Sequence, residues 1–310
     1  MGRIESLAER GSLPVRRSTA WSAWLNRPGV LGYVFVGPIL LLLLVLMAYP
    51  FGVAVYLSLS DRIVARSDTG NFVGLENFAT LLRDSTFRRT IWNSLNYTFV
   101  SVVFKLGLGL LLALLLNEAI PAKRFFRGAF LLPWVVPTSL SILGWLWMFN
   151  STYSVFNWVL THLGGPRLNW LGEPFLAMLS LQIVNVWRGI PFFGIMLLAG
   201  LQSIPRELHE AASIDGANAW QRFWAVTWPL LAPVTMVVTL FSLIHTLADF
   251  QVIYVLTRGG PINSTHVFAT YAHQLAIGGG KIGQGTAAAL MMTPLLAAII
   301  YLQLRELRRP

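Results

Sequence analysis

The sequence predicts an all-α, polytopic membrane protein with six transmembrane helices. Of its 310 residues, 55% are hydrophobic and only 12% are charged, whereas soluble domains carry about 25% charged residues. Twelve tryptophans and nineteen phenylalanines are typical of helices whose aromatic side chains lie at membrane interfaces. The chain has no cysteine, which excludes disulfides, thiolate metal sites and cysteine nucleophiles. This composition excludes most soluble enzymes.

Six stretches have the apolar length of about 20 residues that a helix needs to cross the hydrocarbon core. The predicted spans are Gly29–Ser60, Thr90–Asn117, 128–149, Pro174–Pro205, Phe223–Ala248 and Ile282–Leu304. The third span comes from a charge-free stretch, 128–166, which is too long for one helix and is divided by the polar residues 150–154. We expect a short surface helix after this division.

Charges at the ends of the spans predict the topology. Six spans place both termini on one side, and a cytoplasmic N-terminus puts thirteen Lys and Arg residues inside against eight outside, as the positive-inside rule favours. We therefore expect a basic cytoplasmic tail (1–28), a six-span domain (29–304) and a cytoplasmic C-terminal tail (305–310). The first tail lacks the pattern of a signal peptide. The net charge of +10 reflects topology, and we expect no nucleic-acid partner.

A polar segment, LQSIPRELHEAASIDGANAWQRFW at 201–224, lies between the fourth and fifth spans. Pro205 suits the first turn of a helix, where its missing N–H costs nothing. Gly216 suits the end of that helix, because glycine readily adopts a left-handed conformation. Small residues such as Ala211 and Ala212 would let a partner surface approach closely. An amphipathic helix lying on the membrane is the alternative, and these features alone leave both open.

Several motifs together identify a family. Within the polar segment and after it the chain carries Glu210-Ala211-Ala212, Gly216, Val226 and Trp228-Pro229. This pattern resembles the EAA motif of permease subunits of binding-protein-dependent ABC importers, although Ile and Leu are usual where Val226 and Trp228 stand. The segments FVGLENF at 72–78, LPW at 132–134 and YVLTRGGP at 254–261 are similar to those of the carbohydrate-uptake permeases of the maltose and glycerol-3-phosphate kind.

The resemblance implies a cytoplasmic coupling helix, which we call the coupling segment (residues 204–224). In this family it seats in a cleft of a separate ATPase subunit, so that closure of the ATPase dimer moves the spans as rigid bodies. By resemblance, the residues with this role are Glu210, Ala211, Ala212, Asp215 and Gly216. ATP and Mg²⁺ are then used by the partner ATPase, and no cofactor is expected in this chain.

The resemblance also implies an assembly in a bacterial or archaeal cytoplasmic membrane. The expected partners are a second homologous permease, two ATPase subunits and an extracytoplasmic solute-binding protein. The outer loops, including Arg258–Pro261, are expected to receive the binding protein. The expected function is passage of a sugar or related polyol to the cytoplasm by alternating access.

Two polar stripes predict where the solute passes. The fifth span places four polar side chains on one helical face by the spacing i, i+3, i+4 and i+7: Ser242, His245, Thr246 and Asp249. The fourth span repeats this spacing with Asn185, Gly189 and Phe192. A lipid-facing surface would not carry the stripe of the fifth span. By resemblance to maltose-type permeases they contribute to the sugar site, with Phe192 stacking on a sugar ring.

Other functions remain as alternatives. An ion-coupled secondary transporter would use the three charged groups Lys105, Arg188 and Asp249, but such folds usually show paired internal repeats, which this sequence lacks. Gly278-Gly279-Gly280-Lys281 fails the phosphate-loop pattern because Ile282 follows the lysine. We expect neither an enzyme nor a metal site. The Asp and His of the stripe favour a neutral solute over a phosphate, whereas Arg188 acts in the opposite direction.

Overall fold

The computed structural model of the chain describes residues 28–65, 70–118 and 121–307. These residues are helical or lie in loops, and the strand-like feature among them is one isolated β-bridge between Ser60 and Phe72, so the predicted all-α class is confirmed. The chain divides into two compact units, 1–53 and 54–310. The predicted basic tail lies outside the described residues except for Pro28.

The N-terminal unit contains most of the first predicted span. It holds helix α2 (Pro28–Leu43), the π-helical turn η2 (Leu44–Ala48) and the first half of α3 (Tyr49–Ser58). Together these form an apolar helix, Gly32–Ser58, that is long enough to cross a membrane. The first span is therefore confirmed as a helix.

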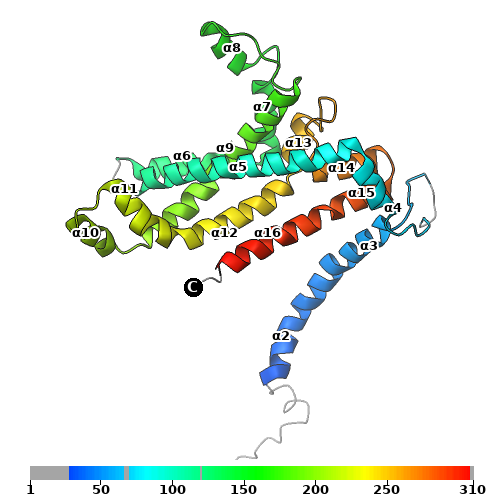
Figure 1. The fold of residues 1–310 in the computed structure, drawn as a ribbon, viewed down its shortest axis with the longest axis horizontal. Helices are drawn as coiled ribbons and strands as arrows, with labels where there is room; N and C mark the ends of the chain where they lie inside the picture. Colours follow the sequence, from blue (N-terminus) through cyan, green and yellow to red (C-terminus); the bar gives the residue numbers. More distant parts are fainter. Residues whose placement is uncertain (1–27, 66–69, 119–120, 308–310) are drawn as a thin grey trace, which may run out of the picture. The chain divides into compact units, whose positions relative to one another are not determined.

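The second unit is organised around three long helices (Figure 1). These are α5 (Ser85–Asn117), α9 (Pro174–Gln202) and α12 (Trp228–Leu247), and all three pack on one another. A Cβ atom added at Gly109 would lie 2.3 Å from Cβ of Phe193, so glycine permits α5 and α9 to cross at very short distance. The packed side chains between them are mainly Leu, Val and Phe.

The third predicted span is broken. Helix α6 (Lys123–Val135) and helix α7 (Thr138–Met148) meet at an angle of 90°. Val136 has extended backbone angles, φ −64° and ψ 132°, as the residue before a proline usually does, and Pro137 follows it. The described residues thus contain five helices that could span a membrane, or six when the bent pair counts as one span.

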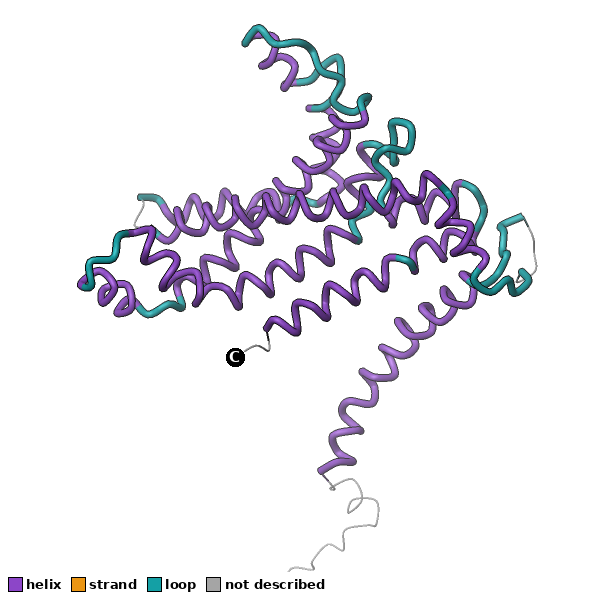
Figure 2. Tube along the Cα trace, in the orientation of Figure 1, coloured by secondary structure: helices purple, strands orange, loops and turns teal. Residues whose placement is uncertain are grey.

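Short elements occupy the two ends of the long helices. One end carries α10 (Arg206–Ile214), α11 (Ala219–Arg222) and the π-helical turn η3 (Phe223–Thr227). The opposite end carries α4 (Glu76–Arg83), α13 (Gln251–Leu256), α14 (Phe268–His273) and η4 (Gln274–Gly278) (Figure 1). Figure 2 shows that the longer loops also gather at the ends of the helices.

Three further helices complete the fold. Helix α8 (Val155–His162) is the short helix expected after the polar residues 150–154. The last span consists of α15 (Ile282–Leu290) and α16 (Met292–Leu307), which pack against α14 and α12 respectively. Helix α16 runs through residues 305–307, so the predicted C-terminal tail begins as a continuation of the helix.

Candidate functional site

A cavity of about 420 Å³ lies between the long helices, and we call it the central cavity. Its lining comes from α5, α6, α7, α9 and α12: Lys105, Trp134, Thr138, Asn185, Arg188, Gly189, Phe192, Phe193, Phe241, Ser242, His245 and Thr246. The structure thus brings six of the seven predicted pathway residues to one place. Their role in solute passage stays a prediction.

The seventh predicted residue, Asp249, lies beside the central cavity without lining it. It is buried, with 6% of its surface exposed. Its Oδ2 accepts hydrogen bonds from Tyr97 Oη (2.9 Å) and Asn185 Nδ2 (2.8 Å), and Arg188 Nη2 lies 3.9 Å away. A buried carboxylate needs such partners. In this arrangement Asp249 orients Asn185 and Arg188, both of which do line the cavity.

The amide of Asn185 has one polar atom without a hydrogen-bond partner among the described residues. Because its Nδ2 donates to Asp249, its Oδ1 is the remaining acceptor. This Oδ1 is buried and has no hydrogen-bond partner among the described residues. An unpaired buried acceptor is costly unless a ligand or water satisfies it. The fold thus leaves this buried acceptor without a hydrogen bond within the described part of the chain.

Lys105 reaches the central cavity from α5. It is only 5% exposed, and its Nζ donates to Thr246 Oγ1 at 2.9 Å, while Thr246 Oγ1 donates to the backbone oxygen of Ser242 at 2.6 Å. A Cβ atom added at Gly189 would lie 2.5 Å from Cδ of Lys105. Gly189 therefore provides the space through which the lysine side chain passes.

Aromatic side chains form another part of the lining. The stripe reasoning predicted Phe192 but missed Trp134, Thr138, Phe193 and Phe241. The first two flank the break between α6 and α7, so their position depends on a bend that apolar length alone does not show. Phe241 precedes Ser242 by one residue and stacks on His245 with ring centroids 6.5 Å apart. Aromatic faces of this kind suit the apolar faces of sugar rings.

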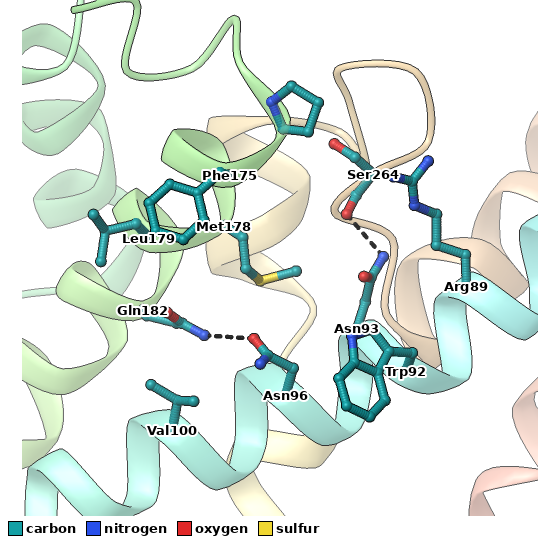
Figure 3. A pocket seen from close by; sticks show the side chains of 11 residues that line it. Arg89, Trp92, Asn93, Asn96, Val100, Phe175, Met178, Leu179, Gln182 and Ser264 are labelled. Carbon is teal, nitrogen blue, oxygen red and sulfur yellow. Dashed lines mark hydrogen bonds between the residues drawn. The ribbon is translucent and has the colours of Figure 1, made fainter.

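A second pocket of about 490 Å³ lies between α5, α9 and the loop after α13 (Figure 3). Gln182 Nε2 donates to Asn96 Oδ1 at 2.9 Å, and Asn93 Nδ2 donates to the backbone oxygen of Ser264 at 2.8 Å. Figure 3 shows these pairs joining helix to helix and helix to loop. None of the predicted site residues lines this pocket. Its polar groups hydrogen-bond to one another between the elements of the fold.

The loop that contains Arg258–Pro261 has a fixed base. Thr265 Oγ1 donates to the backbone oxygen of Gly260 at 2.6 Å, and the ring of His266 fills the space beside Gly259. His266 is 2% exposed, and its burial lowers its pKa to about 4. By contrast, Ile262 at the tip is 85% exposed. The loop thus presents an exposed tip on a rigid base.

The coupling segment folds as the pattern predicts. Helix α10 ends in a left-handed glycine, since Gly216 has φ +81°. Its capping bonds run from Ala217 N to Ala212 O (2.9 Å) and from Gly216 N to Ser213 O (3.1 Å), which is the Schellman arrangement. A Cβ at Gly216 would meet nothing within 4 Å, so the requirement for glycine is conformational.

Helix α11 begins with a capping box. Asn218 Oδ1 accepts from Gln221 N at 2.9 Å, and Gln221 Oε1 accepts from Asn218 N at 2.8 Å. Arg222 then donates to the backbone oxygen of Ala217 at 3.1 Å. Neither α10 nor α11 contains a buried residue. These two helices are therefore ordered by local bonds and exposed on their surface.

The five predicted coupling residues lie together on this segment. Glu210, Ala211, Asp215 and Gly216 are exposed, and Ala212 is half-buried. Exposure of small side chains at the end of a short helix leaves room for a partner surface. Contact with an ATPase subunit stays a prediction.

Comparison with known proteins identifies the family. Residues 105–306 match the family described as "Binding-protein-dependent transport system inner membrane component". The chain is 38% identical over 284 residues to the trehalose/maltose transport system permease protein MalF of Thermococcus litoralis, covering 91% of this chain and 96% of that one. It is 35% identical over 289 residues to the sulfoquinovosyl glycerol transport system permease protein SmoG of Agrobacterium fabrum, covering 93% and 94%.

A solved structure agrees with this relationship. The chain superimposes with a TM-score of 0.78 and 25% identity, over 94% of this chain and 97% of that one, on a chain of a bacterial alginate ABC transporter in complex with alginate pentasaccharide-bound periplasmic protein. The family is one of transport permeases and does not favour the ion-coupled alternative. The chain therefore belongs to the inner-membrane components of binding-protein-dependent transport systems, and it is a multi-pass membrane permease.

Proposed function

We propose that this permease carries a sugar or a related polyol, and that the solute passes through the central cavity. The observation that carries the proposal is the convergence of Asn185, Ser242, His245 and Thr246 with Phe192 around one space inside an apolar bundle. Polar groups within a membrane are costly and normally face a cavity or one another. Hydroxyl, amide and aromatic groups together suit a ligand with many hydroxyls and apolar ring faces.

Relatives support this substrate class. Two of them are named as permeases for trehalose or maltose and for sulfoquinovosyl glycerol, and another, from Agrobacterium fabrum, is named as an sn-glycerol-3-phosphate permease at 30% identity over 281 residues. All of these compounds are sugars or polyol derivatives. The buried Oδ1 of Asn185 would accept a hydrogen bond from a solute hydroxyl.

The permease works as one part of a larger importer. Its partners are a second homologous permease, two ATPase subunits that use ATP and Mg²⁺, and an extracytoplasmic solute-binding protein. Residues 204–224 face the cytosol and seat in the ATPase, and both termini lie inside. The loop around Arg258–Pro261, at the opposite end of the long helices (Figure 1), receives the binding protein. This orientation agrees with the excess of Lys and Arg on the proposed inner side.

Transport then follows from rigid-body motion. Closure of the ATPase dimer on ATP would move the coupling segment, and the spans that border the central cavity would rock about it. Exposure of the cavity would alternate between the two sides of the membrane. The bonds from Asp249 to Tyr97 and Asn185 join α5 and α9 to the end of α12, so these elements would move together.

Reconstitution tests the proposal. Proteoliposomes that contain this chain, its partner permease, the ATPase and the binding protein should take up radiolabelled sugar only when ATP is enclosed with the ATPase. Proteoliposomes with the chain alone should show no uptake under an imposed proton or sodium gradient. Gradient-driven uptake without the ATPase would overturn the assignment.

A further inference from the structure

The central cavity carries more positive than negative charge. Lys105 and Arg188 both line it, whereas no carboxylate lines it within the part of the chain that the structure describes. The acidic group beside it is Asp249, which already accepts bonds from Tyr97 and Asn185. Arg188 Nη2 lies 3.9 Å from that same carboxylate. One carboxylate therefore faces two cations, and one positive charge lacks a counterion.

Lys105 is the cation without a carboxylate partner among the described residues. Its ammonium group has three N–H donors, of which one goes to Thr246 Oγ1 at 2.9 Å. The side chain is held in place because it runs across Gly189, where a Cβ atom would lie 2.5 Å from Cδ. A long side chain near lipid normally extends toward the membrane surface. Here the packing directs it into the cavity.

Arg188 presents the second cation. Its side chain is 27% exposed, in contrast to the 4% of Asp249, so its guanidinium remains accessible from the cavity. Arginine binds carboxylate, sulfonate and phosphate groups through two parallel hydrogen bonds, and lysine adds a compact point charge. Because Arg188 and Gly189 are adjacent on α9, both cations reach the same region of the lining.

We propose that the transported solute carries an acidic group, a carboxylate, sulfonate or phosphate, which binds between Lys105 and Arg188. This inference rests on the proposed function, since it names the class of sugar or polyol that the cavity accepts. An anionic group supplies the missing counterion for a cation inside the membrane, where an uncompensated charge is unfavourable. The aromatic part of the lining and the Oδ1 of Asn185 contact the neutral remainder of the solute.

The sequence alone favours a neutral solute because it places Asp249 among the residues that line the solute pathway. The structure changes this balance by placing the carboxylate beside the cavity and both cations in its wall. A carboxylate from the second permease could serve as counterion instead, and the test below separates the two arrangements.

The test compares neutral solutes with counterparts that carry an acidic group. The importer, assembled in nanodiscs from both permeases and the ATPase, is titrated with three pairs: methyl β-D-glucoside and methyl β-D-glucuronide, glucose and glucose 6-phosphate, glycerol and glycerol 3-phosphate. We expect the acidic member of at least one pair to bind about ten- to a hundredfold more tightly than its neutral counterpart, as charge-assisted hydrogen bonds allow. Lys105→Met and Arg188→Gln should each reduce this preference at least about tenfold.

Matched variants control for folding and for general charge. Lys281→Met and Arg167→Gln remove exposed cations outside the cavity and should leave the preference unchanged. Lys105→Arg retains the charge and should retain the preference even if Lys105→Met proves unstable. The inference is overturned if no acidic member binds more tightly than its neutral partner. It is also overturned if the preference for the acidic solute survives both cavity substitutions. Dissociation of the two permeases in Lys105→Met would likewise overturn it, because the counterion of Lys105 would then be a carboxylate of the second permease. Absence of any ATP-driven sugar uptake by the wild-type importer would instead refute the proposed function.

Discussion

The central cavity and the coupling segment are built in opposite ways. In the cavity, hydrogen bonds join residues far apart in the chain: Tyr97 and Asp249 are separated by 152 positions, and Lys105 and Thr246 by 141. In the coupling segment the side-chain bonds stay local, and even the bond from Arg222 to Ser213 spans only nine positions. The residues that these long-range bonds join are buried, whereas α10 and α11 bury no residue.

This difference indicates which region has its contacts within this chain and which region leaves a surface for a partner. The cavity network satisfies most of its own polar groups and fixes their geometry by packing. The coupling segment has an ordered backbone, but Leu208, Ile214 and Trp220 are 43%, 86% and 70% exposed. Exposed apolar side chains on an ordered helix are typical of a surface that a partner covers. Changes in the cavity should therefore alter stability and solute binding, and changes in the segment should alter coupling alone.

The largest effect is expected at Asp249. Asp249→Leu leaves Tyr97 Oη and Asn185 Nδ2 buried without their acceptor and should lower the free energy of unfolding by about 3–5 kcal/mol. Uptake should fall with it. Thermal unfolding in detergent and uptake by proteoliposomes measure the two effects. Leu302→Ala, on the exposed face of the last span, should change neither quantity by a comparable amount. Equal losses in the two variants would show that the hydrogen bonds of Asp249 have no specific role in uptake.

The next largest effect is expected where Lys105 crosses α9. Gly189→Ala places a methyl group against the lysine side chain and should cost about 1–3 kcal/mol, as overpacking does. Solute affinity should fall because Lys105 must move out of the cavity. Gly107→Ala on α5, where a Cβ meets nothing within 4 Å, is the matched control. Unchanged solute affinity in Gly189→Ala would show that Lys105 does not contribute to solute binding.

The coupling segment should respond differently. Gly216→Trp forces a side chain into a left-handed conformation at a cost of about 1–2 kcal/mol, and it places a bulky ring on the proposed contact surface. We expect uptake per ATP hydrolysed to fall about tenfold while the protein remains in the membrane and still binds solute. Gly164→Trp has the same conformational problem, at φ +80° and with open space, but lies away from the segment. Normal coupling in Gly216→Trp would contradict the role of this turn.

The smallest effect is expected at the cap of α11. Asn218→Ala removes the acceptor for Gln221 N and should destabilise the local helix by about 1 kcal/mol. Coupling should fall by a few-fold without a change in the melting temperature of the bundle, because α10 and α11 bury no residue. Ser154→Ala, which removes the cap of α8, should leave coupling intact. A global loss of stability in Asn218→Ala would show that the segment is not independent.

The sequence by itself determined the features that depend on local patterns. Apolar length predicts the long helices, and Gly216 predicts the end of α10. Helical spacing predicts that Ser242 shares a face with other polar groups and that Asn185 shares one with Gly189 and Phe192. Each of these follows from backbone geometry within one segment, so no knowledge of the neighbours is needed. The family motifs likewise lie in short stretches of sequence.

Only the tertiary structure decided how the segments meet. Helical spacing predicts Asp249 and Thr246 on one face of the fifth span, but α12 ends at Leu247. Asp249 therefore lies beyond the helix and beside the cavity that Thr246 lines. The break at Pro137 brings Trp134 into the lining, and Gly189 leads Lys105 there. These outcomes depend on contacts between residues that are distant in the chain, and periodicity within a single helix carries no information about them.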